Sequence, residues 1–273
     1  MRGISGRITR AVFLSAASIL LVAFVVGAQG PEAGKPAAST TETHPVLIEL
    51  FTSEGCSSCP PADVMLEKLD TYQPVPGAQL IVLSEHVTYW DHDGWKDPNS
   101  SAALTDRQSS YESVLGEKDS FTPQIIVDGA STIRMGQAQQ MEDVFNKAKV
   151  APKLSVGIDD VKIDTTTPAV LRARIHADAT PDKHSADVYV AVALNRFESQ
   201  VLHGENGGKR LTHVAVVQQL TKVGKVEKGK SFDQEVDLKL MPGADPKNLR
   251  LVAFVQEHGP GRVLGAALRN PVN

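Results

Sequence analysis

The chain is poor in cysteine, and Cys56 and Cys59 are the only two among its 273 residues. A structural zinc site takes about four protein ligands, and no second cysteine pair is present to complete one. His86 and His92 would have to fold back from a later polar segment to supply the missing ligands. Zinc is therefore the less favoured interpretation, and we predict no resident metal.

An excess of basic residues is also missing. Three of the 28 Lys and Arg residues, Arg2, Arg7 and Arg10, lie in the first 28 residues, which leaves 25 basic against 32 acidic residues in the rest of the chain. Proteins that bind nucleic acid usually carry a basic patch or stripe. We therefore expect no nucleic-acid partner.

Residues 1–28 have the composition of a secretory signal peptide. Arg7 and Arg10 precede an apolar stretch over residues 11–26, and small residues surround Ala28. This pattern predicts cleavage after Ala28 and a periplasmic or secreted protein. An uncleaved N-terminal membrane anchor is the alternative, although the stretch is shorter than the ~20 residues of a spanning helix. In both cases Cys56 lies outside the cytoplasm.

Residues 29–43 contain no large apolar side chain and are rich in Ala, Pro, Gly and Thr. Such a segment buries too little surface to fold. We expect a flexible tether here.

Residues 44–151 alternate between short apolar runs and segments with helical spacing. The runs at 46–51 and 80–83 predict buried parallel strands, and the runs that flank Asp128-Gly129 predict a hairpin. Helical spacing occurs after residue 60, from Leu104 to Leu115 and from Met141 to Ala148. The resulting order, β-α-β-α-β-β-α, predicts an α/β thioredoxin-like domain over residues 44–151.

Residues 152–273 lose the helical spacing and carry about seven short apolar or alternating runs. Turn signals such as Pro242-Gly243 separate them, and residues 205–209 are interpreted as another turn, without chemistry. This pattern predicts an all-β antiparallel sandwich-like domain.

The cysteine pair follows the first predicted strand and precedes a helix that begins near Pro60. A sulfur at a helix N-terminus lies next to unpaired N–H groups and the positive end of the dipole, which stabilise a thiolate. We therefore predict that Cys56, the more exposed cysteine, attacks a partner and that Cys59 resolves the mixed disulfide. Such exchange needs no bound cofactor.

Two further residues are candidates for this site. Pro123 begins the third predicted strand, and we expect the Thr122–Pro123 bond to be cis and Pro123 to lie beside a bound partner. Glu49, in the first strand, is the candidate proton donor or acceptor for Cys59. The alternative for Glu49 is a carboxylate that faces solvent or a loop.

Residues 84–95 hold both tryptophans and two of the eight histidines. They follow the C-terminal end of a predicted parallel strand, where α/β sheets carry their sites. We expect this loop to form a wall or lid beside Cys56 that chooses partners, and a self-packed surface loop is the alternative.

Other uses of the cysteine pair stay open. A copper chaperone would hold Cu(I) through both thiolates and through His86 or His92. A structural disulfide in an exported binding or assembly protein is a further alternative, although closing so short a loop restricts the unfolded chain little.

Residues 49–63, with Glu54-Gly55-Cys56 and Cys59-Pro60-Pro61, resemble the signature of a family of exported bacterial proteins of unknown function with a thioredoxin-like fold. The similarity continues through Tyr89-Trp90-Asp91, Gly94-Trp95-Lys96-Asp97-Pro98, Arg107-Gln108, Tyr111, Thr122-Pro123-Gln124, Asp128-Gly129, Glu205-Asn206-Gly207-Gly208, His213 and Val252-Ala253-Phe254-Val255-Gln256. The resemblance implies a thioredoxin-like domain followed by a β-rich domain. The general thioredoxin pattern implies a nucleophile at Cys56, a resolving thiol at Cys59 and a substrate-facing cis proline at Pro123.

From these features we predict an exported thiol-disulfide oxidoreductase. Its expected partners are thiols or disulfides of exported proteins, and a membrane redox protein is a further candidate partner.

Overall fold

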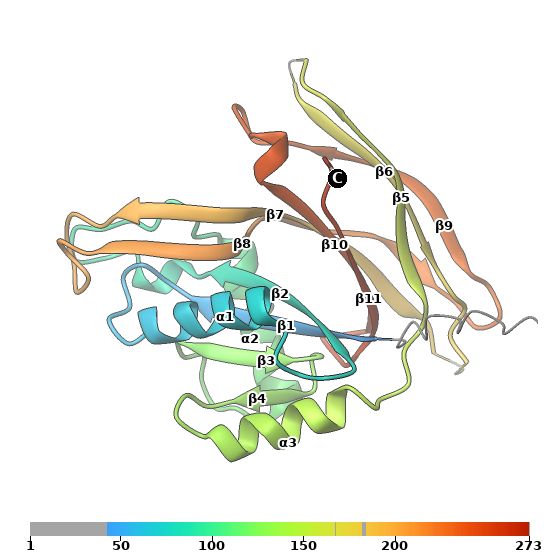
Figure 1. The fold of residues 1–273 in the computed structure, drawn as a ribbon, viewed down its shortest axis with the longest axis horizontal. Coiled ribbons are helices and arrows are strands. Elements are labelled where there is room, and N and C mark those ends of the chain that lie inside the picture. The colour runs from blue at the N-terminus through green and yellow to red at the C-terminus, as the bar shows by residue number, and fades with distance from the viewer. Residues whose placement is uncertain (1–42, 167, 182–183, 273) are drawn as a thin grey trace, which may run out of the picture. The chain divides into compact units, whose positions relative to one another are not determined.

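The first strand of the computed structural model, β1 (His44–Thr52), is buried along most of its length and leads into the cysteine motif (Figure 1). The structure describes residues 43–166, 168–181 and 184–272. Helix α1 (Pro60–Tyr72) follows, and its buried residues Ala62, Leu66 and Leu69 recur at helical spacing. Strand β2 (Ala78–His86) then pairs with β1 in parallel, as expected for strands joined through a helix.

The next elements complete the order predicted for this part of the chain. They are the 3-10 turn η1 (Thr88–Trp90), helix α2 (Ala102–Leu115), strands β3 (Gln124–Val127) and β4 (Ser131–Ile133), and helix α3 (Ala138–Ala148). The β3–β4 hairpin turns at Asp128 and Gly129, whose φ angles of 51° and 61° suit an Asp-Gly turn. The predicted order of strands and helices is confirmed. The thioredoxin-like assignment stays a prediction.

The remaining chain forms the seven strands that the sequence predicts. They are β5 (Val156–Asp164), β6 (Val170–Ala177), β7 (Ala186–Gln200), β8 (Arg210–Val226), β9 (Phe232–Lys239), β10 (Leu249–Glu257) and β11 (Val263–Arg269), with the 3-10 turn η2 (Pro246–Asn248) before β10. Strands β7 and β8 are longer than predicted, because their pairing continues beyond the apolar runs as far as Gln200 and Arg210. This long hairpin brings β8 into contact with α1 (Figure 1).

Two sheets organise the strands. One has eight strands in the order β11-β10-β7-β8-β2-β1-β3-β4, and the other has three in the order β5-β6-β9. Leu171 and Ile175 of the smaller sheet pack against Val190 and Leu251 of the larger one in a shared apolar cluster. The strands after residue 152 therefore pack as two layers, with antiparallel pairing within each sheet.

Strand β8 joins the two parts of the chain. Ser84 of β2 pairs with Val216 of β8, and Leu47 and Ile81 share an apolar cluster with Phe254. The described residues form one compact unit. The division at residues 151 and 152 into two domains stays a prediction, and the structure shows that the two segments share a sheet and part of their core.

Within the described residues, no helix has both the length and the apolar character that crossing a membrane requires. The predicted signal peptide and all but the last residue of the predicted tether lie outside the described residues.

Candidate functional site

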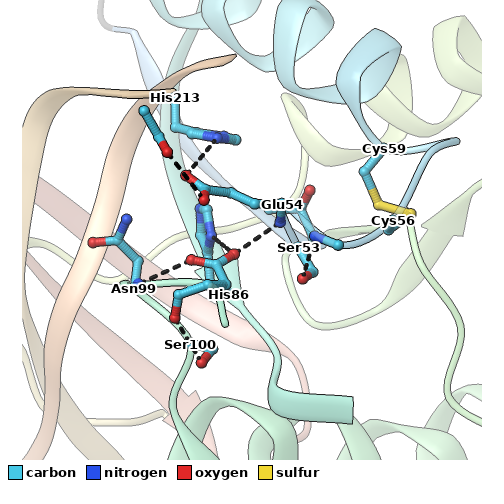
Figure 2. A network of polar contacts seen from close by, with 12 residues as sticks. Ser53, Glu54, Cys56, Cys59, His86, Asn99, Ser100 and His213 are labelled. Carbon is cyan, nitrogen blue, oxygen red and sulfur yellow. Dashed lines mark hydrogen bonds and ion pairs between the residues drawn. A yellow bond between two sulfur atoms is a disulfide. The ribbon is translucent and has the colours of Figure 1, made fainter. Parts of the chain in front are cut away.

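Cys56 and Cys59 form a disulfide at the N-terminus of α1, with their Cα atoms 5.4 Å apart (Figure 2). Cys59 is the N-cap residue, and its carbonyl oxygen accepts hydrogen bonds from the N–H groups of Ala62 and Asp63. Pro60 is well suited to the first helical position, because its φ angle is already helical and it lacks an N–H that would be unpaired there. The sequence therefore fixes the disulfide at the start of the helix.

Both cysteines are fully buried, each with 0% of its surface exposed. The expectation that Cys56 is the more exposed sulfur is wrong. Ser57 and Ser58, between the cysteines, are exposed. Cys56 is buried because segments distant in sequence pack around the cysteine loop (residues 53–59), a cover that helix position alone does not predict.

The loop after β2 supplies part of this cover. Gly55 lies so close to Trp90 that a Cβ atom at residue 55 would be 2.5 Å from the Trp90 carbonyl oxygen. The indole N–H of Trp90 donates to Thr122 Oγ1 at 2.6 Å, and the indole N–H of Trp95 donates to Glu54 Oε2 at 2.9 Å. The predicted position of this loop beside the cysteine motif is confirmed. Its role in choosing partners stays a prediction.

The Thr122–Pro123 peptide bond is cis, as expected. Pro123 directly precedes β3, whose residue Gln124 pairs with Phe51 near the end of β1. The proline therefore lies at the end of the sheet from which the chain enters the cysteine loop. Its side chain is partly exposed. Contact between Pro123 and a bound partner stays a prediction.

The structure does not bring Glu49 to the cysteines. Alternation along β1 puts Glu49 on the face of Phe51, which packs with α2, whereas Ile48 and Leu50 pack with α1 on the other face. Glu49 is fully buried and accepts hydrogen bonds at 2.6 Å from Arg107 Nε and from the Tyr111 hydroxyl. It neither faces solvent nor lies on the side of the sheet where Cys59 caps α1.

A second buried carboxylate, Glu85, shares the same guanidinium. Arg107 Nε lies 3.6 Å from Glu85 Oε1, and neither carboxylate oxygen of Glu85 has a hydrogen-bond partner among the described residues. Burial and the neighbouring Glu49 raise the pKa of Glu85 well above its ordinary value, although Arg107 opposes them. One arginine thus serves two buried acids, and the protonated form of Glu85 is favoured relative to an exposed glutamate.

We expect Glu85→Gln to raise the free energy of unfolding at pH 7, because the raised pKa of Glu85 costs stability once the unfolded chain is ionised. Since the folded state holds this proton more tightly, wild-type stability falls as pH rises above the ordinary Glu value, and glutamine removes that dependence. Urea unfolding at pH 5 and pH 8 measures both effects. Exposed Glu235→Gln is the control, and lower stability of Glu85→Gln at pH 8 contradicts the prediction.

Glu54 anchors the cysteine loop through its main chain and its side chain. Its N–H donates to Asp97 Oδ2 at 2.8 Å, and its carbonyl oxygen accepts from the Asn206 amide at 2.8 Å. Its carboxylate accepts from Trp95 and from the hydroxyl of Ser199. Burial and the nearby Asp97 raise the pKa of Glu54, against the opposing effect of His213. The residue two positions before Cys56 is therefore fixed by three separate segments.

His86 and Asp97 form a fully buried pair beside Glu54 (Figure 2). His86 Nδ1 lies 2.7 Å from Asp97 Oδ2. Burial alone lowers the pKa of His86, but Asp97, with Asp63 and Glu54, outweighs it, so the pKa is raised. Burial alone raises the pKa of Asp97. His86 and the backbone N–H groups of Glu54 and Asn99 outweigh burial, so the pKa of Asp97 is lowered. Each partner therefore favours the ionised form of the other.

His213, from β8, completes this cluster. Its Nε2 lies 3.7 Å from Glu54 Oε1, its Nδ1 lies 3.6 Å from Asp63 Oδ1, and its ring meets that of His86 edge to face. Neither ring nitrogen has a hydrogen-bond partner among the described residues. The His–carboxylate cluster, namely Glu54, Asp63, His86, Asp97 and His213, thus connects the cysteine loop, through Glu54, to α1, β2 and β8.

The histidines proposed as copper ligands have other partners. Asp97 engages His86, and exposed His92 pairs with Asp93. In the part of the chain that the structure describes, no group of three or more His, Cys, Asp and Glu side chains has the geometry of a metal site.

Sequence reasoning missed Asn206, whose segment was interpreted as a turn without chemistry. The fully buried Asn206 amide donates to the carbonyl oxygens of Glu54 and Cys56, at 2.8 and 2.9 Å. It also missed Asp97 and Ser199, and it gave His213 no role. The one available signal was that Asp97, Asn206 and His213 belong to the segments that resemble the family.

Comparisons with known proteins agree with this resemblance in part. A crystal structure of a protein from Agrobacterium tumefaciens, whose name gives no function, is 25% identical, has a TM-score of 0.63, and is matched over 83% of this chain and 94% of that one. The sporulation control protein Spo0M from Bacillus subtilis matches with a TM-score of 0.28 and 11% identity over 43% of this chain and 46% of its own, which is too distant to interpret. No curated protein matches. The model of the family described as "Protein of unknown function (DUF1223)" matches residues 47–256, and the chain therefore belongs to this family.

Proposed function

We propose that this protein is an exported thiol-disulfide oxidoreductase that exchanges disulfides with protein cysteines through Cys56 and Cys59. The observation that carries the proposal is the disulfide at the N-terminus of α1, with Cys59 as the N-cap residue. Once the pair is reduced, the helix N-terminus favours the thiolate that exchange requires. The cis proline at the same end of the sheet supports the proposal.

In the oxidising direction, a partner thiolate attacks Sγ of Cys56, and the electron pair of the broken S–S bond leaves on Cys59. The second partner thiol then attacks the mixed disulfide, so that the partner gains the disulfide and this protein takes up two electrons and two protons. In the reverse direction, the Cys56 thiolate attacks a partner disulfide and Cys59 resolves the intermediate.

Titration of the mature protein in glutathione buffers, with alkylation trapping, tests this function. We expect a reversible two-electron transition. Cys59→Ser should accumulate mixed disulfides with partner proteins that carry a disulfide, because the Cys56 thiolate attacks that disulfide and nothing then resolves the bond at Cys56. Cys56→Ser is the matched control and should accumulate few. A pair that stays oxidised over the whole glutathione range rejects the proposal.

Complete burial of both cysteines favours a second function, that of an exported binding or assembly protein with a structural disulfide. Structural disulfides of secreted proteins typically have potentials below about −300 mV and resist the glutathione pool. The same titration therefore separates the two functions.

A further inference from the structure

The turn between β7 and β8 (residues 201–209) packs on the cysteine loop but is otherwise exposed. Val201 and Asn206 are its only buried residues. The turn holds its own shape, because Gly208 N–H donates to the Val201 carbonyl and Lys209 N–H donates to that of Asn206. Gly204 and Gly208 have φ angles of 75° and 84°, which suit glycine. The turn is therefore a preformed unit that meets the cysteine loop through few side chains.

Asn206 makes the main contact between these two segments. One N–H₂ group donates to both the Glu54 and the Cys56 carbonyl oxygens, and the amide oxygen accepts from Lys209 Nζ at 2.8 Å. Both amide hydrogens of Asn206 are thus donated to carbonyl oxygens of the cysteine loop, one on each side of Gly55. The exposed carboxylate of Glu205 adds a weaker contact by accepting the N–H of Ser57 at 3.1 Å.

We propose that Asn206 is the positioning residue of Cys56, and that it holds the turn of residues 201–209 closed over the oxidised cysteine pair. Both sulfurs are buried, and Asn206 bonds the main chain on either side of Gly55, so in this proposal the contact must open before an attacking group reaches Cys56. Because the turn is preformed, it lifts as a unit when the two amide hydrogen bonds break. This inference rests on the proposed exchange at Cys56 and adds the step that limits its rate.

Reduction of the native disulfide by tris(2-carboxyethyl)phosphine measures this opening directly. The phosphine attacks a sulfur, and water then releases two thiols and the phosphine oxide, so the reaction runs to completion whatever the potential of the pair. The two thiols are counted by alkylation and mass spectrometry. We expect Asn206→Ala to be reduced about tenfold faster than the wild type, because two hydrogen bonds that close the loop are lost.

Asn195→Ala is the matched control. Asn195 lies on β7, before the turn that holds Asn206, and its amide likewise donates to a main-chain carbonyl, that of Leu249, away from the cysteines. This variant should lose stability to urea without faster reduction. Equal reduction rates for wild type and Asn206→Ala overturn the proposal, as does equal acceleration in Asn195→Ala.

Glu205→Ala provides a second variant should Asn206→Ala fold poorly. We expect two- to threefold faster reduction and faster hydrogen exchange of the Ser57 N–H, with unchanged stability to urea, because this contact is exposed. If hydrogen exchange of the Ser57 N–H and phosphine reduction are both as slow in Glu205→Ala as in the wild type, the closed turn is contradicted. If the pair stays oxidised in the glutathione titration but phosphine reduces Asn206→Ala faster than the wild type, the oxidoreductase function is rejected and the closed turn is retained. If the pair titrates reversibly but Asn206→Ala is reduced no faster than the wild type, only the closed turn is rejected.

Discussion

Arg107→Met is expected to lower the free energy of unfolding by about 3–5 kcal/mol at pH 7, the largest stability effect we predict. The guanidinium is the cation that faces both Glu49 and Glu85, and it also donates to Tyr111 and Gln256. Methionine retains much of the packing volume but leaves two buried carboxylates without a positive charge. Urea or thermal unfolding measures the loss, which corresponds to a decrease in melting temperature of roughly 10 °C.

The pH dependence distinguishes this explanation from a simple packing defect. Without Arg107, nothing opposes the burial that raises the pKa of Glu85, so the folded state binds this proton more tightly than the unfolded chain does. The difference in the free energy of unfolding between wild type and Arg107→Met should therefore be smallest near pH 4 and should grow as pH rises through neutrality. Arg172→Met, which removes an exposed pair with Asp237, is the control and should change the free energy of unfolding little. A deficit that is constant with pH contradicts the electrostatic explanation.

Local patterns predicted the elements of this fold well. The apolar run of β1, the helical spacing of Ala62, Leu66 and Leu69, and the Asp128-Gly129 turn each depend on neighbouring residues, and each is present. The parallel pairing of β1 and β2 follows from the helix that connects them. These features require no knowledge of which distant segments meet.

The environment of the cysteines depends on contacts between segments that are distant in sequence, and the sequence predicts it less well. Trp90 packs against Gly55, next to Cys56, and the Cys56 carbonyl oxygen accepts from Asn206, which lies 150 positions later in the chain. Glu49 was placed on β1 correctly, but its partner Arg107 comes from α2, and strand alternation alone does not name it. Side-chain identity therefore predicted the disulfide, while the three-dimensional arrangement decides how exposed it is.

Asp97→Asn should weaken the base of the cysteine loop. Asp97 Oδ2 accepts the N–H of Glu54 and pairs with His86, while Oδ1 accepts the N–H of Asn99 at 2.9 Å. The amide group of asparagine has one acceptor atom and no charge, so one buried N–H and the imidazolium lose their partner. We expect a loss of about 3–4 kcal/mol in the free energy of unfolding at pH 5.5.

The stability that Asp97→Asn loses relative to the wild type should be smaller at alkaline pH. The raised pKa of His86 means that its contribution to stability is complete below its ordinary value of 6.5 and disappears as pH rises through the folded value. The lowered pKa of Asp97 means that its contribution is present above 3.8 and is lost in acid. The pair therefore stabilises the protein most between these two values. Urea unfolding at pH 5.5 and pH 9 measures the difference, with exposed Asp237→Asn as the control.

The same substitution should also change the chemistry of the disulfide. Glu54 N–H loses its acceptor on one side of the cysteine loop, while Asn206 still holds the Glu54 and Cys56 carbonyls on the other. We therefore expect phosphine reduction of Asp97→Asn to accelerate less than that of Asn206→Ala, although Asp97→Asn loses more stability. If reduction rates instead follow global stability across the two variants, then the disulfide is exposed by unfolding of the whole protein and not by local release of the turn.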